Sequence, residues 1–246
     1  MKQLRALPLV MLSIFASVSM IPFSFADDLL GPELVSVASD DIFAPPGFDD
    51  NDNAQLVVHG QLINTCFKAA APQVTVDKEK KLIVVQPQAY FYSGCWCLSM
   101  MVPFTQAIDL GVLPAGKYRV VEYDKKGGVR QESAITIAQQ KTSAPDDLLY
   151  AAVKSARVEL VGSTSTLILN GTLNDDCLEI QDTRVLHRTE HVIEVLPVTA
   201  YKQGTTCQSK PRPFELKVAL PEMEPGNSLI HIRSLNGQAI NTVELL

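Results

Sequence analysis

The chain has no cluster of basic residues and few residues arranged for catalysis. Its 246 residues carry 21 Lys and Arg against 27 Asp and Glu, a net charge of −6. Without a basic patch a protein has little means of neutralising phosphates, so nucleic acid is excluded as a partner. There are four His and one Trp, and we find neither a glycine-rich phosphate loop nor a nucleophile-elbow sequence. The sequence therefore predicts a non-catalytic binding or structural protein with no cofactor, whose partner is an unknown protein or cell-envelope ligand.

Long apolar runs are absent after residue 26, but one precedes it. Lys2 and Arg5 are followed by an uncharged stretch over 6–26 that ends in small residues and Phe. This order is typical of a secretory signal peptide, the alternative being a membrane anchor. We expect cleavage after Ala26, no membrane span in the mature chain, and a periplasmic or extracellular location. Loss of the two basic residues takes the net charge from −6 to −8.

The mature chain contains an internal duplication. Residues 82–127 align without a gap with 192–237, at an offset of 110 and with 11 identities. Upstream, 57–62 matches 168–173 at an offset of 111. Such a repeat indicates two copies of one structural unit. The expected parts are a signal peptide at 1–26, a first domain at 27–139 with an acidic loop at 40–53, a linker at 140–150, and a second domain at 151–246.

Both copies have the pattern of β structure. Apolar, β-branched runs at 55–59 and 166–169 end at glycine, and those at 82–85 and 192–195 are each stopped by a proline two residues later. About six or seven short runs of this kind recur at regular spacing in each copy. They predict an all-β protein of two tandem immunoglobulin-like antiparallel β-sandwich domains.

All five cysteines lie in the mature chain. In an oxidising compartment, well-separated cysteines are read first as disulfides. The repeat aligns Cys66 with Cys177 and Cys97 with Cys207, which predicts the bridges Cys66–Cys97 and Cys177–Cys207. Cys95 has no counterpart and is left as a free or intermolecular thiol, although a Cys66–Cys95 pairing stays open. A Cys95-linked homodimer, with an assembly or redox role, is an alternative function.

The stretch 187–191 matches the H-x-x-E-H pattern of inverted zinc peptidases. His187, Glu190 and His191 would make the chain a metal-dependent hydrolase, which is a further alternative function. That chemistry requires a helix, so that both histidines face one metal ion. The duplication instead aligns these residues with a charged turn between two strands, so we expect a solvated hairpin tip and no metal.

The acidic loop offers a second, weaker metal pattern. Asp49, Asn51 and Asn53 have a D-x-N-x-N spacing that could supply oxygen ligands to calcium. The EF-hand pattern then fails, because Ala54 stands at the glycine position and Gly60 at the position of the bidentate glutamate. We expect an exposed acidic loop.

An aromatic segment of the first copy is the most distinctive local feature. Trp96, the single tryptophan, lies between two cysteines, and Tyr90, Tyr92 and Met100 are close in sequence. The second copy lacks most of this segment. Apolar aromatic surface present in one copy only is a candidate binding face.

The first copy also resembles a set of exported bacterial proteins of uncharacterised function with duplicated, cysteine-containing β-sandwich domains. The resemblance implies export and a β fold, and no activity. The residues that carry it are 47–53, 57–60, a later cysteine, Pro103-Phe104, Leu110-Gly111 and 116–118.

Overall fold

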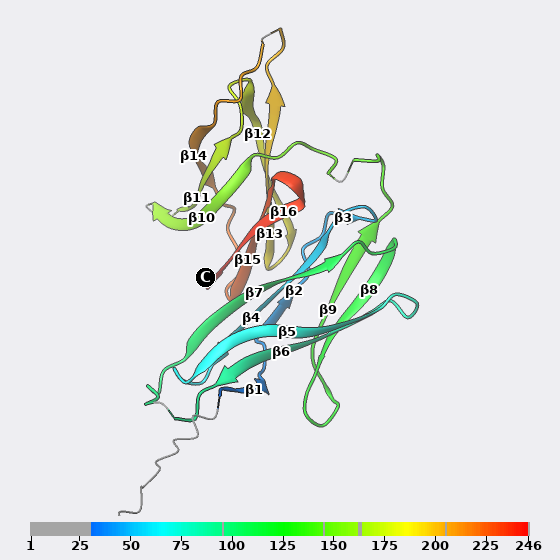
Figure 1. The fold of residues 1–246 in the computed structure, drawn as a ribbon, viewed down its shortest axis with the longest axis vertical. Helices are drawn as coiled ribbons and strands as arrows, with labels where there is room; N and C mark the ends of the chain where they lie inside the picture. Colours follow the sequence, from blue (N-terminus) through cyan, green and yellow to red (C-terminus); the bar gives the residue numbers. More distant parts are fainter. Residues whose placement is uncertain (1–30, 95, 145, 162–163, 205, 246) are drawn as a thin grey trace, which may run out of the picture. The chain divides into compact units, whose positions relative to one another are not determined.

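The computed structural model describes residues 31–94, 96–144, 146–161, 164–204 and 206–245. In this part of the chain the regular elements are β strands and one short 3-10 turn, η1 (Leu235–Gly237), so the all-β prediction is confirmed (Figure 1). No helix in these residues is long and apolar enough to cross a membrane. The predicted signal peptide, 1–26, lies outside the described residues.

The first half of the chain forms a sandwich of two sheets, here called the first sandwich. One layer has the order β1-β6-β8-β9-β3. In this layer β5 pairs along one edge of β6, and β1 and β8 share the other edge. The second layer has the order β2-β4-β7 (Figure 1). A single apolar core that includes Leu56, Ile83 and Tyr118 fills the space between the layers. The strands are β1 (Glu33–Ser36), β2 (Asp41–Phe43), β3 (Phe48–Asp49), β4 (Ala54–Leu62), β5 (Phe67–Asp77), β6 (Leu82–Phe91), β7 (Val102–Gly111), β8 (Gly116–Tyr123) and β9 (Val129–Ala138).

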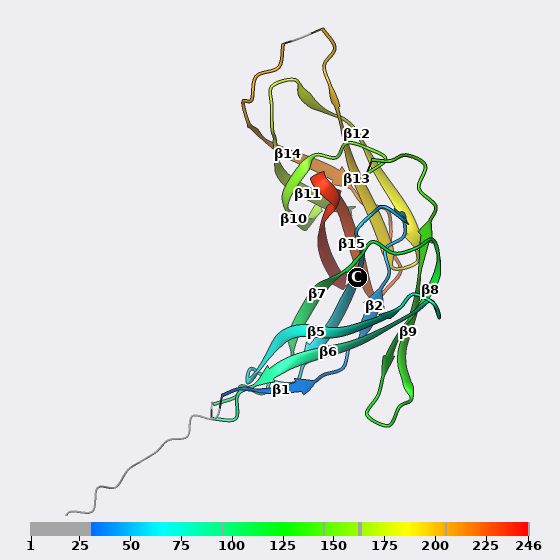
Figure 2. The same cartoon turned by 45° about the vertical axis from the view of Figure 1, so that its right-hand side comes forward.

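The second half repeats this plan as the second sandwich. Its layers have the orders β10-β11-β14 and β12-β13-β15-β16 (Figure 2). Its core includes Leu167, Ile193 and Ile230. The strands are β10 (Ala152–Val161), β11 (Thr164–Leu173), β12 (Leu178–Thr189), β13 (Val192–Tyr201), β14 (Arg212–Ala219), β15 (Asn227–Ser234) and β16 (Gln238–Leu245).

The strand order differs from the expected immunoglobulin arrangement. In that arrangement the fourth strand pairs in the sheet of the first, second and fifth. Here the fourth strand, β6 or β13, stays in the sheet of its hairpin partner and pairs in parallel with β8 or β15. The hairpin is the physical reason, because the turn at Glu190–His191 is too tight to carry β13 to the other layer. The sheets are therefore mixed rather than purely antiparallel.

A repeated Gly–Phe contact explains part of the duplicated sequence. Gly60 lies opposite Phe104 across β4 and β7, and Gly171 lies opposite Phe214 across β11 and β14. A β-carbon at Gly171 would lie 2.5 Å from the Phe214 ring and 2.2 Å from the Ala152 carbonyl oxygen. Glycine is required at both positions because a ring and a backbone carbonyl already occupy the space.

The two central strands of the second sandwich are buried almost along their whole length. Glu194 on β13 and His231 and Arg233 on β15 are all buried, although they carry polar groups. Residues of the first sandwich cover them, and Val57 of β4 also joins an apolar cluster with Leu229 of β15. Strands covered on both faces lose the alternation of buried and exposed residues that marks an outer sheet.

Candidate functional site

The two disulfides close equivalent tips, one at the end of each sandwich. Cys66 is joined to Cys97 and Cys177 to Cys207, with Cα–Cα distances of 5.2 and 5.3 Å. An Asx turn precedes the first cysteine of each pair: Asn64 Oδ1 accepts from the Cys66 amide, and a carboxylate oxygen at the aligned position accepts from the Cys177 amide, both at 2.9 Å.

The backbone hydrogen bonds of the two tips correspond as well. The Tyr92 amide donates to the Cys66 carbonyl as the Lys202 amide donates to the Cys177 carbonyl. The Met100 amide donates to the residue two before it, as does the amide of Lys210. The two tips are thus the same scaffold with different side chains.

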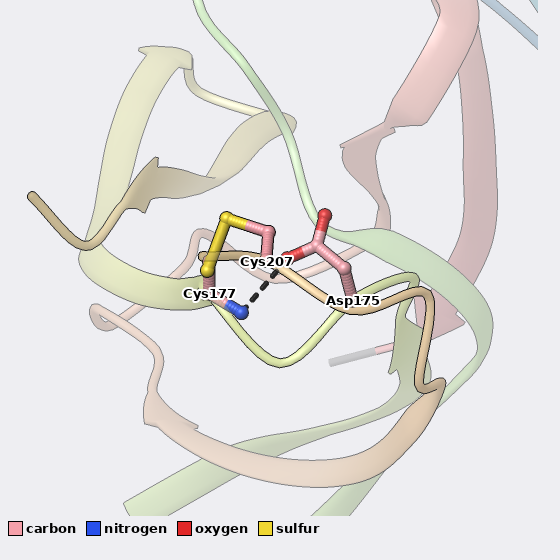
Figure 3. Close-up of side chains that lie close together, drawn as sticks. All are labelled: Asp175, Cys177 and Cys207. Atoms are coloured by element: carbon pink, nitrogen blue, oxygen red, sulfur yellow. Dashed lines mark hydrogen bonds between the residues drawn. A yellow bond between two sulfur atoms is a disulfide. The ribbon is translucent and has the colours of Figure 1, made fainter. Parts of the chain in front are cut away.

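The tip of the second sandwich resembles a metal cluster without being one. Asp175, Cys177 and Cys207 bring their ligand atoms within 4.8 Å of one another (Figure 3). The sulfurs are bonded to each other and therefore offer no thiolate, which is the form that binds metal. Asp175 instead accepts hydrogen bonds from the amides of Cys177 and Leu178.

The tip of the first sandwich exposes apolar side chains where the second exposes polar ones. Trp96 is 101% exposed and Leu98 is 66% exposed, and their aligned residues are Thr206 and Gln208. From 82 to 108 the chain carries no charged residue, whereas the aligned stretch of the second copy carries six. The exposed apolar residues of this tip, here called the apolar tip, are Ile63, Tyr90, Tyr92, Trp96, Leu98, Met100 and Met101.

A cleft of about 360 Å³ adjoins the apolar tip. Its lining comes from β1, β4, the start of β5 and the end of β6, and includes Val35, Phe67, Phe91 and Lys125. Ile63 belongs both to this lining and to the apolar tip. The cleft and the tip therefore form one continuous, mostly apolar surface with a recess for a side chain.

A known family matches both halves of the chain, including both tips. The model of the ORF11 beta-sandwich domain matches residues 56–132 and 167–245. The chain belongs to this family. Each matched region contains one disulfide and one Gly–Phe pair, so the ORF11 domain occurs twice. Searches of curated proteins and of solved structures find no match.

The zinc-peptidase pattern lies in the second ORF11 domain as a β hairpin. His187 belongs to β12, Glu190 and His191 form the turn, and β13 begins at the next residue. His187 and Glu190 are exposed. Their ligand atoms do not form a group within 4.8 Å in the described part of the chain, so the geometry gives the hydrolase alternative no support.

The acidic loop, which precedes the first region matched by the ORF11 model, uses several of its polar groups for hydrogen bonds within the chain. Asp49 Oδ1 accepts from the Asn51 amide at 3.1 Å, and Asn51 Nδ2 donates to the carbonyls of Thr142 and Ala144 at 3.0 and 2.9 Å. Asn53 Nδ2 donates to Asp109 at 3.3 Å. The calcium site at Asp49, Asn51 and Asn53 stays a prediction, and the hydrogen bonds of Asn51 fasten this loop to the segment that follows the first domain.

A buried charge network joins the two sandwiches, and the sequence analysis missed it. Arg233 Nη2 donates to the Gly47 carbonyl at 2.8 Å, and Arg233 Nε donates to Glu194 Oε1 at 3.3 Å. Its guanidinium also stacks on the Phe48 ring, 4.1 Å from the centroid. The Asp52 carboxylate is 3.9 Å away, and burial raises the pKa of Asp52 to about 6.

A signal for this network exists in the sequence. Glu194 and Arg233 align with Val84 and Tyr123 of the first copy, so charged residues stand within strands where the first copy has an apolar and an aromatic residue. Buried charges are rarely tolerated without partners. The acidic loop, inserted in the other copy, is the partner that this pattern requires.

One residue singled out in the sequence analysis lies outside the described residues. Cys95 is not among the described residues, so the free-thiol and homodimer predictions stay predictions. The residues of the predicted binding face, Tyr90, Tyr92, Trp96 and Met100, all lie in the apolar tip.

Proposed function

We propose that the chain is an exported, non-catalytic binding protein, and that the apolar tip of the first sandwich captures a protein partner. The observation that carries the proposal is the comparison between the two tips. One scaffold, with matching disulfides and backbone hydrogen bonds, holds exposed apolar residues in one copy and polar residues in the other. Scaffold stability therefore does not require the apolar side chains.

The exposed side chains of the apolar tip are of the kinds that bind protein surfaces. Exposed aromatic residues and methionine are enriched at protein interfaces, where Trp and Tyr often contribute most of the binding energy. The adjoining cleft offers a pocket for a partner's side chain. Binding to an anionic membrane would instead need basic residues beside the apolar ones. The segment 82–108 has none, and although Lys68 lies opposite Tyr90 and Lys125 lines the cleft, the chain as a whole is acidic.

A site-specific photocrosslinker tests the proposal in cells that produce the protein. A benzophenone amino acid at position 96 should give a discrete crosslinked band that identifies the partner. The matched control is the same amino acid at position 206, which occupies the aligned place on the polar tip and should give no such band. Leu98→Gln and Met100→Lys, which copy the second tip, should remove the band at position 96 without unfolding the protein.

Each other outcome would count against the proposal. No band at position 96, or equal bands at 96 and 206, would show that the apolar tip has no dedicated partner. A band at twice the mass of the chain would identify a second copy as the occupant. If Cys95→Ser abolished that dimer, the assembly role of Cys95 would replace the proposal.

A further inference from the structure

Two methionines occupy the connection between the first disulfide and the strand that follows it. Met100 and Met101 come after Cys97 and before β7, at the end of the first sandwich where β6 finishes (Figure 1). Each of the two side chains is 53% exposed. A thioether that faces solvent is open to oxidation, because an oxidant can reach its sulfur.

The backbone keeps both side chains at the surface. The disulfide anchors the chain before them, and Val102, which pairs with Leu62, anchors it after them. Between these points the Met100 amide donates to the Leu98 carbonyl at 2.9 Å, which closes a tight turn. Within the described residues, neither methionine belongs to the apolar core of the first sandwich. The two thioethers can therefore withdraw from solvent only if these contacts break.

The third methionine of the described residues has a different environment. Met223 is partly buried and packs against the apolar core of the second sandwich. Met100 and Met101 align with Lys210 and Pro211, so the polar tip carries no thioether. In the part of the chain that the structure describes, the well-exposed thioethers are both in the apolar tip.

The fold of the tip does not depend on methionine. The polar tip has an equivalent disulfide, and the Lys210 amide donates to the Gln208 carbonyl at 2.7 Å, as the Met100 amide donates to Leu98. A polar side chain at this place is therefore compatible with the turn. A sulfoxide, which is the polar product of thioether oxidation, can form there without unfolding the tip.

We propose that Met100 and Met101 are a reversible oxidation site for a hydroperoxide, and that their oxidation turns the apolar tip polar. A lone pair of each sulfur attacks the distal oxygen of the peroxide, so that a sulfur–oxygen bond forms and the O–O bond breaks. Each sulfur loses two electrons and becomes a sulfoxide. The peroxide gains them and, with its proton, leaves as an alcohol, or as water when it is hydrogen peroxide.

The sulfoxides make the surface of the first tip resemble that of the second. A sulfoxide oxygen accepts hydrogen bonds from water, and a partner that covers it must remove that water at a cost in free energy. Oxidation therefore weakens partner capture, and methionine sulfoxide reductases restore it. This consequence rests on the proposed function, whereas the selective oxidation of the tip and its change of polarity do not.

Timed treatment of the purified chain with hydrogen peroxide tests the site. Peptide mapping by mass spectrometry follows the gain of one oxygen at each methionine. A Cys95→Ser background removes the cysteine that is outside the two disulfides, so that no thiol consumes the oxidant. We expect Met100 and Met101 to oxidise about tenfold faster than Met223, because they are the more exposed. Equal rates at the three positions would overturn the proposal.

Retention on a phenyl column shows whether oxidation changes the surface. The peroxide-treated chain should elute earlier than the untreated chain, and reductases specific for the two sulfoxide epimers should together restore its retention. Each variant is compared with itself before and after peroxide. The double substitution Met100→Leu and Met101→Leu should abolish the shift, whereas the matched control Met223→Leu should keep it. An unchanged retention of the wild type, or the same shift in the double variant, would contradict the proposal.

The crosslink at position 96 separates this inference from the proposed function. The chain with the photocrosslinker is oxidised, freed of peroxide and mixed with an extract of the producing cells. Loss of the band after oxidation supports the inference. A band that persists when both methionines are sulfoxides overturns it and leaves the proposed function standing. If the untreated chain gives no band, the proposed function fails, while selective oxidation and the column shift still support the oxidation site.

Discussion

Replacing Arg233 with methionine should destabilise the protein far more than removing an exposed arginine. The Arg233 side chain is 5% exposed. Its guanidinium contacts Glu194, the Gly47 carbonyl, the Phe48 ring and, at 3.9 Å, Asp52. Methionine retains much of the aliphatic volume and none of the charge or donors. The substitution therefore leaves buried acceptors behind without creating a large cavity.

The expected loss of unfolding free energy follows from the buried carboxylates that Arg233→Met leaves behind. Removing one partner of a buried ion pair costs about 3–5 kcal/mol, because the other charge stays buried without compensation. Glu194 keeps Arg188 at 2.8 Å, whereas Asp52 loses the buried positive charge beside it. We therefore expect a loss near the lower end of the range, about 3 kcal/mol. That is a large fraction of the 5–15 kcal/mol by which domains are usually stable.

Urea unfolding at pH 7, followed by circular dichroism with both disulfides oxidised, measures the loss. Arg119→Met is the matched control. Arg119 and Glu132 are closer, at 2.7 Å, yet their side chains are 49% and 52% exposed. Solvent screening leaves such an exposed pair with little effect on stability. If Arg233→Met cost less than Arg119→Met, burial at the contact between the sandwiches would not have the energetic role inferred here.

Three other substitutions or probes test separate parts of the structure. Burial lowers the pKa of His231 to about 4; the folded state then binds fewer protons than the unfolded state, so stability is lost as pH falls from about 6.5 to 4. His231→Asn should remove up to about 3 kcal/mol of that loss, measured as the difference between urea midpoints across pH 4–7, and equal profiles would contradict the assignment. Asp52, whose pKa is raised, acts with the opposite sign, because its contribution is lost as pH rises through about 6. Gly171→Ala should cost about 2 kcal/mol or more through overpacking, measured by thermal unfolding, and a neutral result would show that the Phe214 ring can move aside. Trp96 should be quenched by iodide as readily as free indole, since it is fully exposed, and protection in the isolated chain would mean that the apolar tip is already covered.

The disulfides and the apolar tip were predictable because the duplication provides an internal comparison. A single copy would have left three cysteines with several pairings. Two copies aligned Cys97 with Cys207 and left Cys95 over, and the structure contains the bridges that this alignment predicts. The same comparison marked the segment around Trp96 as unusual. The exposure of this segment depends on how the disulfide-closed tip folds, and the sequence alone does not show that.

The strand order could not be predicted from the same patterns. Alternation of apolar residues identifies a strand and its buried face, but it carries no information on which neighbour pairs along its edge. In β13 even the alternation is missing, since Glu194 and its neighbours on both faces are buried. The choice between an immunoglobulin order and the mixed sheet depends on how the hairpin before β13 turns, and that turn was identified only as a charged tip.

The acidic loop and the buried charges of the second sandwich are two parts of one feature. A solvated loop would need no counterpart, and charged residues inside strands would destabilise a domain that stood alone. Together they compensate each other, because Arg233 reaches the Gly47 carbonyl, the Phe48 ring and Asp52 of the loop. The two copies thus differ in complementary ways: the first has the loop and an apolar tip, whereas the second has a polar tip and buried charges where the loop covers it. The contact between the sandwiches is therefore specified by charge.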